Sequence, residues 1–223
     1  MFNESIKSKI VGNLKITDKD TGEILVNKKN AIHPGNVAYV MAHALAGLPT
    51  SVDIDGNAPT IGWMAFGNGG STSTATLSYR SPQVSTVYDS MISGNSRLYS
   101  KTYDHRLVKD EPEGKSQVEI FYAGDLVDTP ESTSRIKFTA VMNHNDVATQ
   151  TGELIPSSDS SDDESSVAAF TFDEIGLLVG PALGDNTIDE LKAIMLTHVT
   201  FHPVLLSANR TITVEYTVTL QIG

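Results

Sequence analysis

Residues 211–222 alternate without interruption between apolar and polar side chains. Six apolar residues occupy every second position, from Ile212 to Ile222, and threonine, glutamate and glutamine fill the positions between them. Successive side chains of a β-strand point to opposite faces of its sheet, so this alternation predicts a strand with one buried and one solvated face. Half-buried strands of this kind are typical of antiparallel sheets. The segment therefore favours a fold built around an antiparallel sheet.

Other parts of the chain predict further strands. Residues 136–142 place alternate apolar side chains on one face, and residues 118–122, 170–179 and 194–201 are apolar or alternating. Residues 10–17 and 23–26 flank a polar turn in which Gly22 supplies a positive φ angle, which predicts a hairpin. Residues 75–110 alternate only weakly, so two or three strands are expected there. Their inward side chains are expected to be Leu77, Tyr79, Val84, Val87, Leu98 and Tyr103.

The most apolar strand is expected at residues 61–66, which include Trp63, the only tryptophan of the chain. We expect this strand at the centre of the fold. It runs into a glycine-rich turn at residues 67–74. Such a turn can bind phosphate, but this one has neither the lysine of a P-loop nor the third glycine of a dinucleotide site. We interpret it as a flexible turn.

One helix is predicted at about residues 34–46. Pro34 suits the first helical position and Gly47 ends the pattern. Apolar residues recur at helical spacing, so one face is expected to be core, with the lone His43 beside it. A capping box at Thr187 and Glu190 predicts a short helical turn. The predicted core face consists of Val37, Val40, Met41, Ala44 and Leu45.

These patterns together predict a mainly β protein. We expect a single antiparallel β-sandwich-like domain over residues 1–223, with one principal helix and long polar loops. The longest biased stretch, residues 156–166, has four acidic residues and no apolar side chain after its proline. It cannot contribute to a core and is interpreted as a mobile surface loop.

Composition excludes several functions. The chain has 223 residues and no cysteine, so disulfides, thiolate nucleophiles and cysteine-bound metals are excluded. Its formal net charge of −11 opposes nucleic acid, and Lys28 with Lys29 is only a pair. No run approaches the roughly 20 apolar residues of a membrane helix, and the N-terminus resembles no secretory signal. We expect synthesis in a cytoplasm, with no nucleic-acid or membrane partner.

Three candidate cation sites are weak. The Asp18–Gly22 turn looks like a calcium loop, but its glycine is not sixth and it lacks the distal glutamate. His198 and His202 would share a strand face about 13 Å apart, too far to bind one ion without a bend at Pro203. The third candidate is the acidic loop, with Asp159, Asp162, Asp163 and Glu164. No metal site is predicted.

Two candidate catalytic groups also fail. Ser96 lies in a segment that begins like a nucleophile elbow, but Leu98 stands where the second glycine must be. Asp173 and Glu174 are adjacent, so in a regular strand they would point to opposite faces and could not act as a paired acid and base. The sequence predicts no catalytic, cofactor-binding or metal-binding residues, and no enzyme activity.

The order of several segments resembles structural proteins of tailed bacteriophages, from the tail, baseplate or neck. The matching segments cover about half of the chain: residues 21–25 with 30–32, the helix at 37–46, residues 61–70 with their Gly-x-Gly turn, 174–178, 201–204 and 211–220. The resemblance implies a non-enzymatic building block of the virion, without a cofactor. Such a protein would pack in rings or sleeves with copies of itself and with other virion proteins.

Two alternatives remain open. The first is a capsid decoration protein, which would also act through its surfaces. The second is a carbohydrate-binding β-sandwich, which would stack sugars on exposed aromatic side chains. Trp63 lies in the most apolar predicted strand, and aromatic residues make up only 7% of the chain, which speaks against the second alternative.

Overall fold

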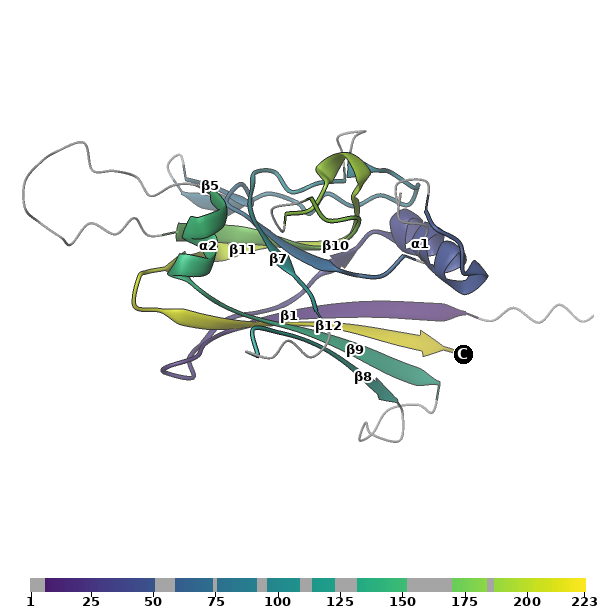
Figure 1. The fold of residues 1–223 in the computed structure, drawn as a ribbon, viewed down its shortest axis with the longest axis horizontal. Helices are drawn as coiled ribbons and strands as arrows, with labels where there is room; N and C mark the ends of the chain where they lie inside the picture. The colour runs from purple at the N-terminus through teal and green to yellow at the C-terminus, as the bar shows by residue number, and fades with distance from the viewer. Residues whose placement is uncertain are drawn as a thin grey trace, which may run out of the picture.

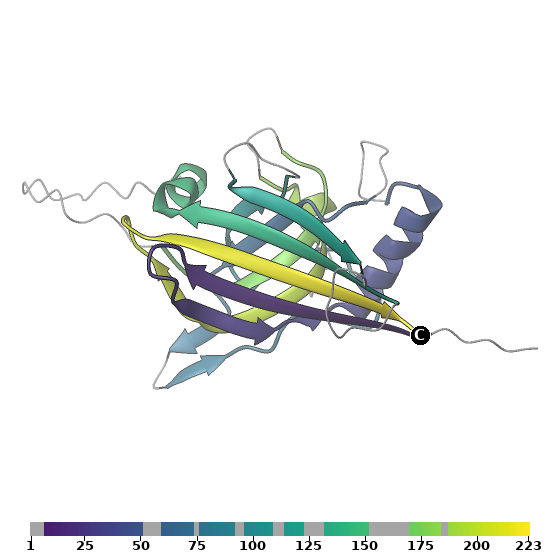
Figure 2. The ribbon, with the colours of Figure 1, turned by 90° about the horizontal axis from the view of Figure 1, so that it is seen from below.

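The computed structural model describes residues 7–50, 59–73, 76–91, 96–108, 114–122, 132–151, 170–183 and 187–223. Two five-stranded antiparallel sheets pack face to face, as Figures 1 and 2 show. Sheet A contains, in spatial order, β2 (Ile24–Lys29), β1 (Ser8–Asp18), β12 (Thr211–Ile222), β9 (Thr133–Asn143) and β8 (Ser116–Tyr122). Sheet B contains β3 (Ala31–Ile32), β11 (Ile194–Leu206), β10 (Phe170–Val179), β4 (Trp63–Gly67) and β7 (Lys101–Arg106). The predicted mainly β, sandwich-like fold is confirmed.

Smaller elements surround the two sheets. A hairpin of β5 (Ser71–Ser73) and β6 (Leu77–Tyr79) follows β4. Besides the predicted helix α1 (Pro34–Ala46), a short helix α2 (His144–Thr151), which the sequence analysis did not predict, follows β9. A 3-10 turn, η3 (Glu190–Lys192), precedes β11 and is capped by Asp189 instead of the predicted Thr187. No helix in the described part of the chain is long and apolar enough to cross a membrane.

The core between the sheets is formed by the apolar faces that alternation predicts. The even positions of β12 from Ile212 to Val218 are buried against sheet B, together with Phe138 of β9. Phe172 of β10 packs edge-on against Phe66 and Phe201, which ties the strands of sheet B to this core. Burial of such large side chains contributes about 1.5 to 3 kcal/mol each. The face assignments for β9 and β12 were therefore correct, except that Ile222 is 52% exposed.

The strand around Trp63 is buried throughout, but it is not the middle strand. In sheet B, β10 is central and β4 lies between β10 and the edge strand β7. Weak alternation also gave wrong faces nearby. Leu98 and Tyr103 are buried as predicted, whereas Leu77, Tyr79 and Val87 are exposed. Leu77 and Tyr79 are exposed because β6 pairs with β5 in a hairpin outside both sheets, and Val87 lies in the irregular segment after β6.

The bounds of α1 agree with the prediction, and both ends are capped. The side chain of His33 accepts a hydrogen bond from the Asn36 amide at the first turn, and Gly47 adopts the left-handed conformation with φ of 64° at the end. The predicted core face of this helix is correct only at Val37 and Val40, which pack in one apolar cluster with β11. Val40 is buried, but Met41 and Ala44 are exposed and Leu45 is 86% exposed. The helix covers only one end of sheet B, so most of its apolar stripe has no layer of the described chain above it.

Other predictions have mixed outcomes. The hairpin after β1 is confirmed, with Gly22 at φ of 74°. The acidic stretch at 156–166 and residue 74 of the glycine-rich turn lie outside the described residues.

Candidate functional site

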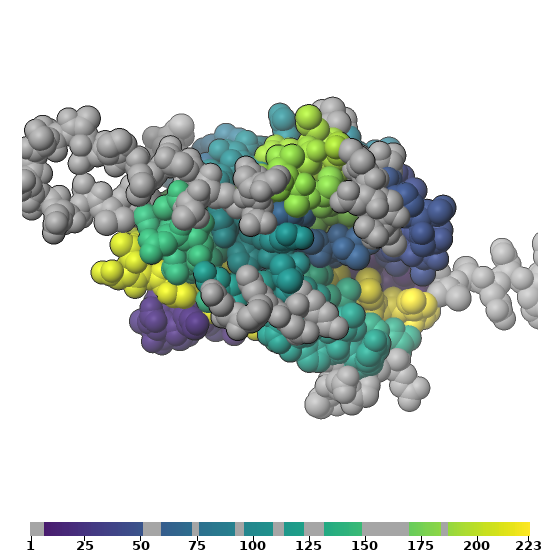
Figure 3. All heavy atoms as spheres, viewed as in Figure 1, coloured from purple at the N-terminus to yellow at the C-terminus, as the bar shows by residue number. Residues whose placement is uncertain are grey.

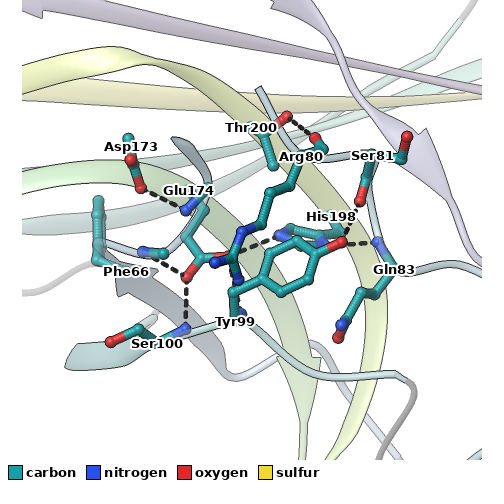
Figure 4. Close-up of polar contacts among 12 residues, drawn as sticks. Phe66, Arg80, Ser81, Gln83, Tyr99, Ser100, Asp173, Glu174, His198 and Thr200 are labelled. Carbon is teal, nitrogen blue, oxygen red and sulfur yellow. Dashed lines mark hydrogen bonds and ion pairs between the residues drawn. The ribbon is translucent and has the colours of Figure 1, made fainter. Parts of the chain in front are cut away.

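The outer face of sheet B, turned away from sheet A, carries a buried polar cluster around Glu174 (Figure 4). The Glu174 side chain is fully buried, and its two oxygens accept four hydrogen bonds. Oε1 accepts from the amides of Gly69 and Ser100, at 3.1 and 2.8 Å. Oε2 accepts from the Tyr99 amide at 2.9 Å and contacts Nε2 of His198 at 3.0 Å. One carboxylate thus joins three separate segments of the chain. We name Glu174, His198 and these amides the Glu174 cluster.

Asp173 lies beside Glu174 on the same side of sheet B. Its Oδ1 accepts from the Gly70 amide at 2.7 Å, and its Oδ2 accepts from the Ser71 amide at 2.8 Å. The prediction that the two carboxylates point to opposite faces is therefore wrong. The cause is a β-bulge, since the register between β10 and β11 shifts between Phe172 and Glu174. The glycine-rich turn thus bonds both oxygens of Asp173 and, through the Gly69 amide, one oxygen of Glu174.

The glycine-rich turn is anchored to β10 by these carboxylates at Gly69, Gly70 and Ser71. An added Cβ at Gly70 would lie 2.5 Å from the Asp173 carbonyl oxygen, and one at Gly67 would lie 2.4 Å from the Ser100 carbonyl oxygen. The glycines permit this close approach of backbones. Because the amides of Gly69, Gly70 and Ser71 already donate to carboxylates, they are not available to bind phosphate.

His198 is fixed in one neutral tautomer by its neighbours. Its Nδ1 accepts a hydrogen bond from the Gln83 amide at 2.8 Å, so the ring proton must be on Nε2, which donates to Glu174. The ring is completely buried beneath Tyr99, whose ring centroid lies 5.7 Å away. Arg80 in turn stacks over the outer face of Tyr99 at 4.8 Å. Figure 4 shows these side chains as successive layers over the carboxylate.

The Glu174 carboxylate is stabilised in its ionised form. Burial alone would raise its pKa, but hydrogen bonds from His198 and from the Tyr99 and Ser100 amides outweigh burial, and the pKa lies below its ordinary value. A general base needs a pKa near the working pH and access to a substrate proton. Glu174 has neither, because its oxygens are covered and all its acceptor directions are used.

A second buried cluster contains Ser96, which was considered as a nucleophile. Its Oγ lies 2.6 Å from Nε2 of His33 and 3.1 Å from Oδ2 of Asp89. Ser96 and His33 are both fully buried. These three residue types are those of a catalytic triad, and sequence reasoning missed the two partners of the serine. Ser96 and His33 are 63 positions apart, and no local pattern joins them.

The protons in this cluster run in the wrong direction for a triad. Nδ1 of His33 accepts from the Asn36 amide at 3.1 Å, so Nε2 carries the ring proton and donates to Ser96. Ser96 then donates its own proton to Asp89. In a triad, histidine accepts the serine proton and the carboxylate binds the other ring nitrogen. Burial also lowers the pKa of His33, in keeping with a neutral ring. The cluster is a structural hydrogen-bond chain.

Both clusters attach the irregular chain between β6 and β7 to sheet B. Glu174 and His198 hold residues 83, 99 and 100, while Asn36 holds Asp89 through two hydrogen bonds of 2.8 Å. Glu174, His198 and Asn36 therefore fix a segment that has little regular secondary structure of its own. Nearly complete pairing of buried polar groups is what stability requires.

The remaining predicted candidates lie apart. Asp18 caps its own turn by accepting from the Asp20 and Thr21 amides and pairs with Arg210, so it is not arranged around an ion. His202 is exposed and contacts Tyr79, whereas His198 is buried with Glu174. Among the described residues, no group of three or more His, Asp or Glu side chains could hold a metal ion. The acidic loop is outside the described residues.

Two features bear on binding at the surface. Trp63 is only 2% exposed, and its Nε1 donates to the Gly180 carbonyl at 3.0 Å, so it cannot stack on a sugar. By contrast, α1 lies at one end of the molecule, where Figure 3 shows its dark blue atoms at the surface. It contains no Asp, Glu, Lys or Arg. A groove of about 300 Å³ separates it from β1, lined by Ser8, Ile10, Ile32, Pro34, Val37, Ala38 and Met41.

Comparison of the chain with protein families, with curated proteins and with solved structures finds no match.

Proposed function

We propose that this chain is a non-enzymatic structural protein of a tailed-bacteriophage particle. It is a component of the tail, baseplate or neck, which assembles as a ring or docks on other proteins of the virion. The phage-like order of segments supplies the class of protein. The observation that carries the proposal is the exposed apolar surface of α1, because it supplies a means of assembly.

The exposed side of α1 is unusual for a surface helix. A helix that packs on one side normally presents charged side chains to water on the other. Here the side away from the core carries Met41 and Leu45, and Leu48 follows directly after the helix with 56% exposure. A contiguous exposed apolar surface marks a site of contact with another protein. We name Met41, Leu45, Leu48 and the adjoining groove the α1 surface.

The use of the buried polar groups supports a role without catalysis. The two clusters with catalytic residue types are closed, and their donors and acceptors face one another. A protein whose polar interior only fixes its loops performs its function at its surface. The partner of the α1 surface is another virion protein with an apolar surface, since a helix without charged side chains offers no pairing for a charged one.

The test combines a surface variant with purified particles. Leu45→Glu adds a charge at a site that is 86% exposed, so it should leave the melting temperature unchanged while preventing incorporation into virions. Leu191→Glu is the matched control, because Leu191 is 68% exposed but lies on η3 and is not part of the α1 surface. It should incorporate normally.

Mass spectrometry of purified particles measures incorporation. Absence of the unmodified protein from virions, or saturable turnover of a substrate by the purified chain, would refute the proposed function. Normal incorporation of Leu45→Glu would refute the role assigned to the α1 surface.

A further inference from the structure

The edge strands of the two sheets differ in how they are protected. Natural sheets cover or interrupt their edges, because an open edge pairs with other chains. On sheet B, β3 has only two residues, and β7 is held by η3 through the ion pair of Lys101 with Glu190. On sheet A, the side chain of Lys28 on β2 reaches across to the Thr200 carbonyl of sheet B.

The remaining edge strand, β8, has none of these features. It is seven residues long and pairs with β9 without a register shift. It contains neither proline nor lysine, and no described strand pairs with its other side. Figure 2 shows β8 as the teal strand at the border of sheet A. β8 is thus a regular and unpaired edge within the described structure.

The hydrogen-bond pattern identifies which backbone groups face outward. The Val141 amide donates to the Lys115 carbonyl, and these two residues continue the register of β8 with β9. In an antiparallel pair, hydrogen-bonded positions alternate. Odd-numbered residues of β8 therefore bond to β9, and the backbone groups of Val118 and Ile120 point away from the sheet. Their side chains are apolar, and Ile120 is 56% exposed.

We propose that β8 pairs antiparallel with β8 of a second copy of this chain, with Ile120 opposite Ile120 on a two-fold axis. In this register the outward backbone groups of the two Ile120 residues bond to each other. Val118 faces Tyr122 of the partner, so the apolar faces of the two strands form one surface. The two A sheets become a single ten-stranded sheet. An isologous contact of this kind needs only one self-complementary strand.

Charge on the opposite face of the strand agrees with this register. Glu119 would face Phe121 of the other copy, and Arg135 is the neighbour of Phe121 across the β8 to β9 ladder. Each carboxylate therefore approaches a guanidinium of the other copy. In the single chain, Oε2 of Glu119 pairs with Nζ of Lys137 at 2.5 Å, whereas Nε of Arg135 is buried without a hydrogen bond to the described residues. The pairing would bring the Arg135 guanidinium of one copy toward the Glu119 carboxylate of the other, beside Lys137.

The β8 pairing names a second copy of the chain as one partner in the proposed assembly. It rests on the proposed function only for its biological role, because the contact itself is argued from the geometry of β8. The contact lies on sheet A, whereas the α1 surface lies on the helix beside sheet B. The two proposals therefore fail separately. A β8 dimer formed by a protein absent from virions would refute the function alone.

The absence of native cysteines makes disulfide trapping a direct test. Hydrogen-bonded residues across antiparallel strands have Cα atoms about 5.5 Å apart, which a disulfide can bridge. Ile120→Cys should form a covalent dimer under mild oxidation. Gln117→Cys is the matched control, since it is exposed on the same strand but would lie about 20 Å from its symmetry mate. It should stay monomeric.

A second variant tests the same edge without oxidation. Ile120→Pro removes the amide that points outward and leaves the ladder with β9 intact, so it should abolish dimers in sedimentation while the fold persists. The pairing would be overturned if Ile120→Cys stays monomeric up to the solubility limit. Equal cross-linking of Gln117→Cys would also overturn it, because it would show random collision or a different register.

Discussion

Glu174→Gln is the most informative single substitution, because it changes one charge and almost no volume at a fully buried site. Each carboxylate oxygen accepts two hydrogen bonds, one pair from Gly69 and Ser100 and the other from Tyr99 and His198. Whichever oxygen is replaced by the NH₂ group of glutamine, the two groups that donated to that oxygen then face another donor and lose their acceptor. His198 cannot adapt by moving its proton to Nδ1, because Nδ1 accepts from the Gln83 amide.

The expected cost follows from the number of bonds lost. A hydrogen bond to a charged group contributes about 1.5 to 3 kcal/mol, so losing two costs about 3 to 6 kcal/mol. Natural domains are stable by only about 5 to 15 kcal/mol. The variant should therefore unfold at much lower urea concentration, with an unchanged dependence of the unfolding free energy on urea.

Glu215→Gln provides the matched control. Glu215 lies on the outer face of sheet A, is 31% exposed, and faces Lys15 and Lys137 at 3.6 and 3.9 Å. A solvent-exposed ion pair of this kind contributes less than about 1 kcal/mol. If both variants lose similar stability in urea titrations followed by circular dichroism, the Glu174 carboxylate does not hold the surrounding segments together.

Two further predictions concern the core. Burial lowers the pKa of His105 to about 4, from an ordinary value near 6.5, so the unfolded chain binds more protons between these values. The contribution of His105 to the unfolding free energy should be constant above pH 6.5 and should fall by up to about 3 kcal/mol as the pH drops to about 4. In His105→Gln, the unfolding free energy should depend much less on pH over this range. An unchanged pH dependence in that variant would exclude His105 as the cause. On β12, Val218 is 7% exposed on the inner face and Thr217 lies on the outer face. Val218→Asp should lower the melting temperature far more than Thr217→Asp, because it buries an unpaired charge, and equal losses would mean that the faces are reversed.

Local chemistry in the sequence was sufficient for much of the fold. The alternation in β9 and β12 correctly identified the side chains that form the core, because a strand's period of two is a property of its backbone. The bounds of α1 followed from Pro34 and Gly47, whose backbone preferences act within one turn. The turn at Gly22 was predictable for the same reason.

The polar clusters were not predictable in this way. Ser96 was recognised as a candidate, but His33 and Asp89 reach it only because the chain between β6 and β7 folds over sheet B. The bulge that turns Asp173 and Glu174 to the same side depends on pairing between strands that are distant in sequence. A short window of residues encodes neither the spatial neighbours of Ser96 nor the register between β10 and β11.

Exposure of apolar side chains was also decided by tertiary structure. The stripe on α1 and the alternation on β8 both look like core patterns, yet Leu45 is 86% exposed and Ile120 is 56% exposed. Periodicity identifies which side chains share a face of a helix or strand. Whether another layer covers that face depends on the lengths and positions of elements elsewhere in the fold. The sequence thus determined the apolar faces of this protein, and only the packing of its two sheets decided which of them stayed exposed.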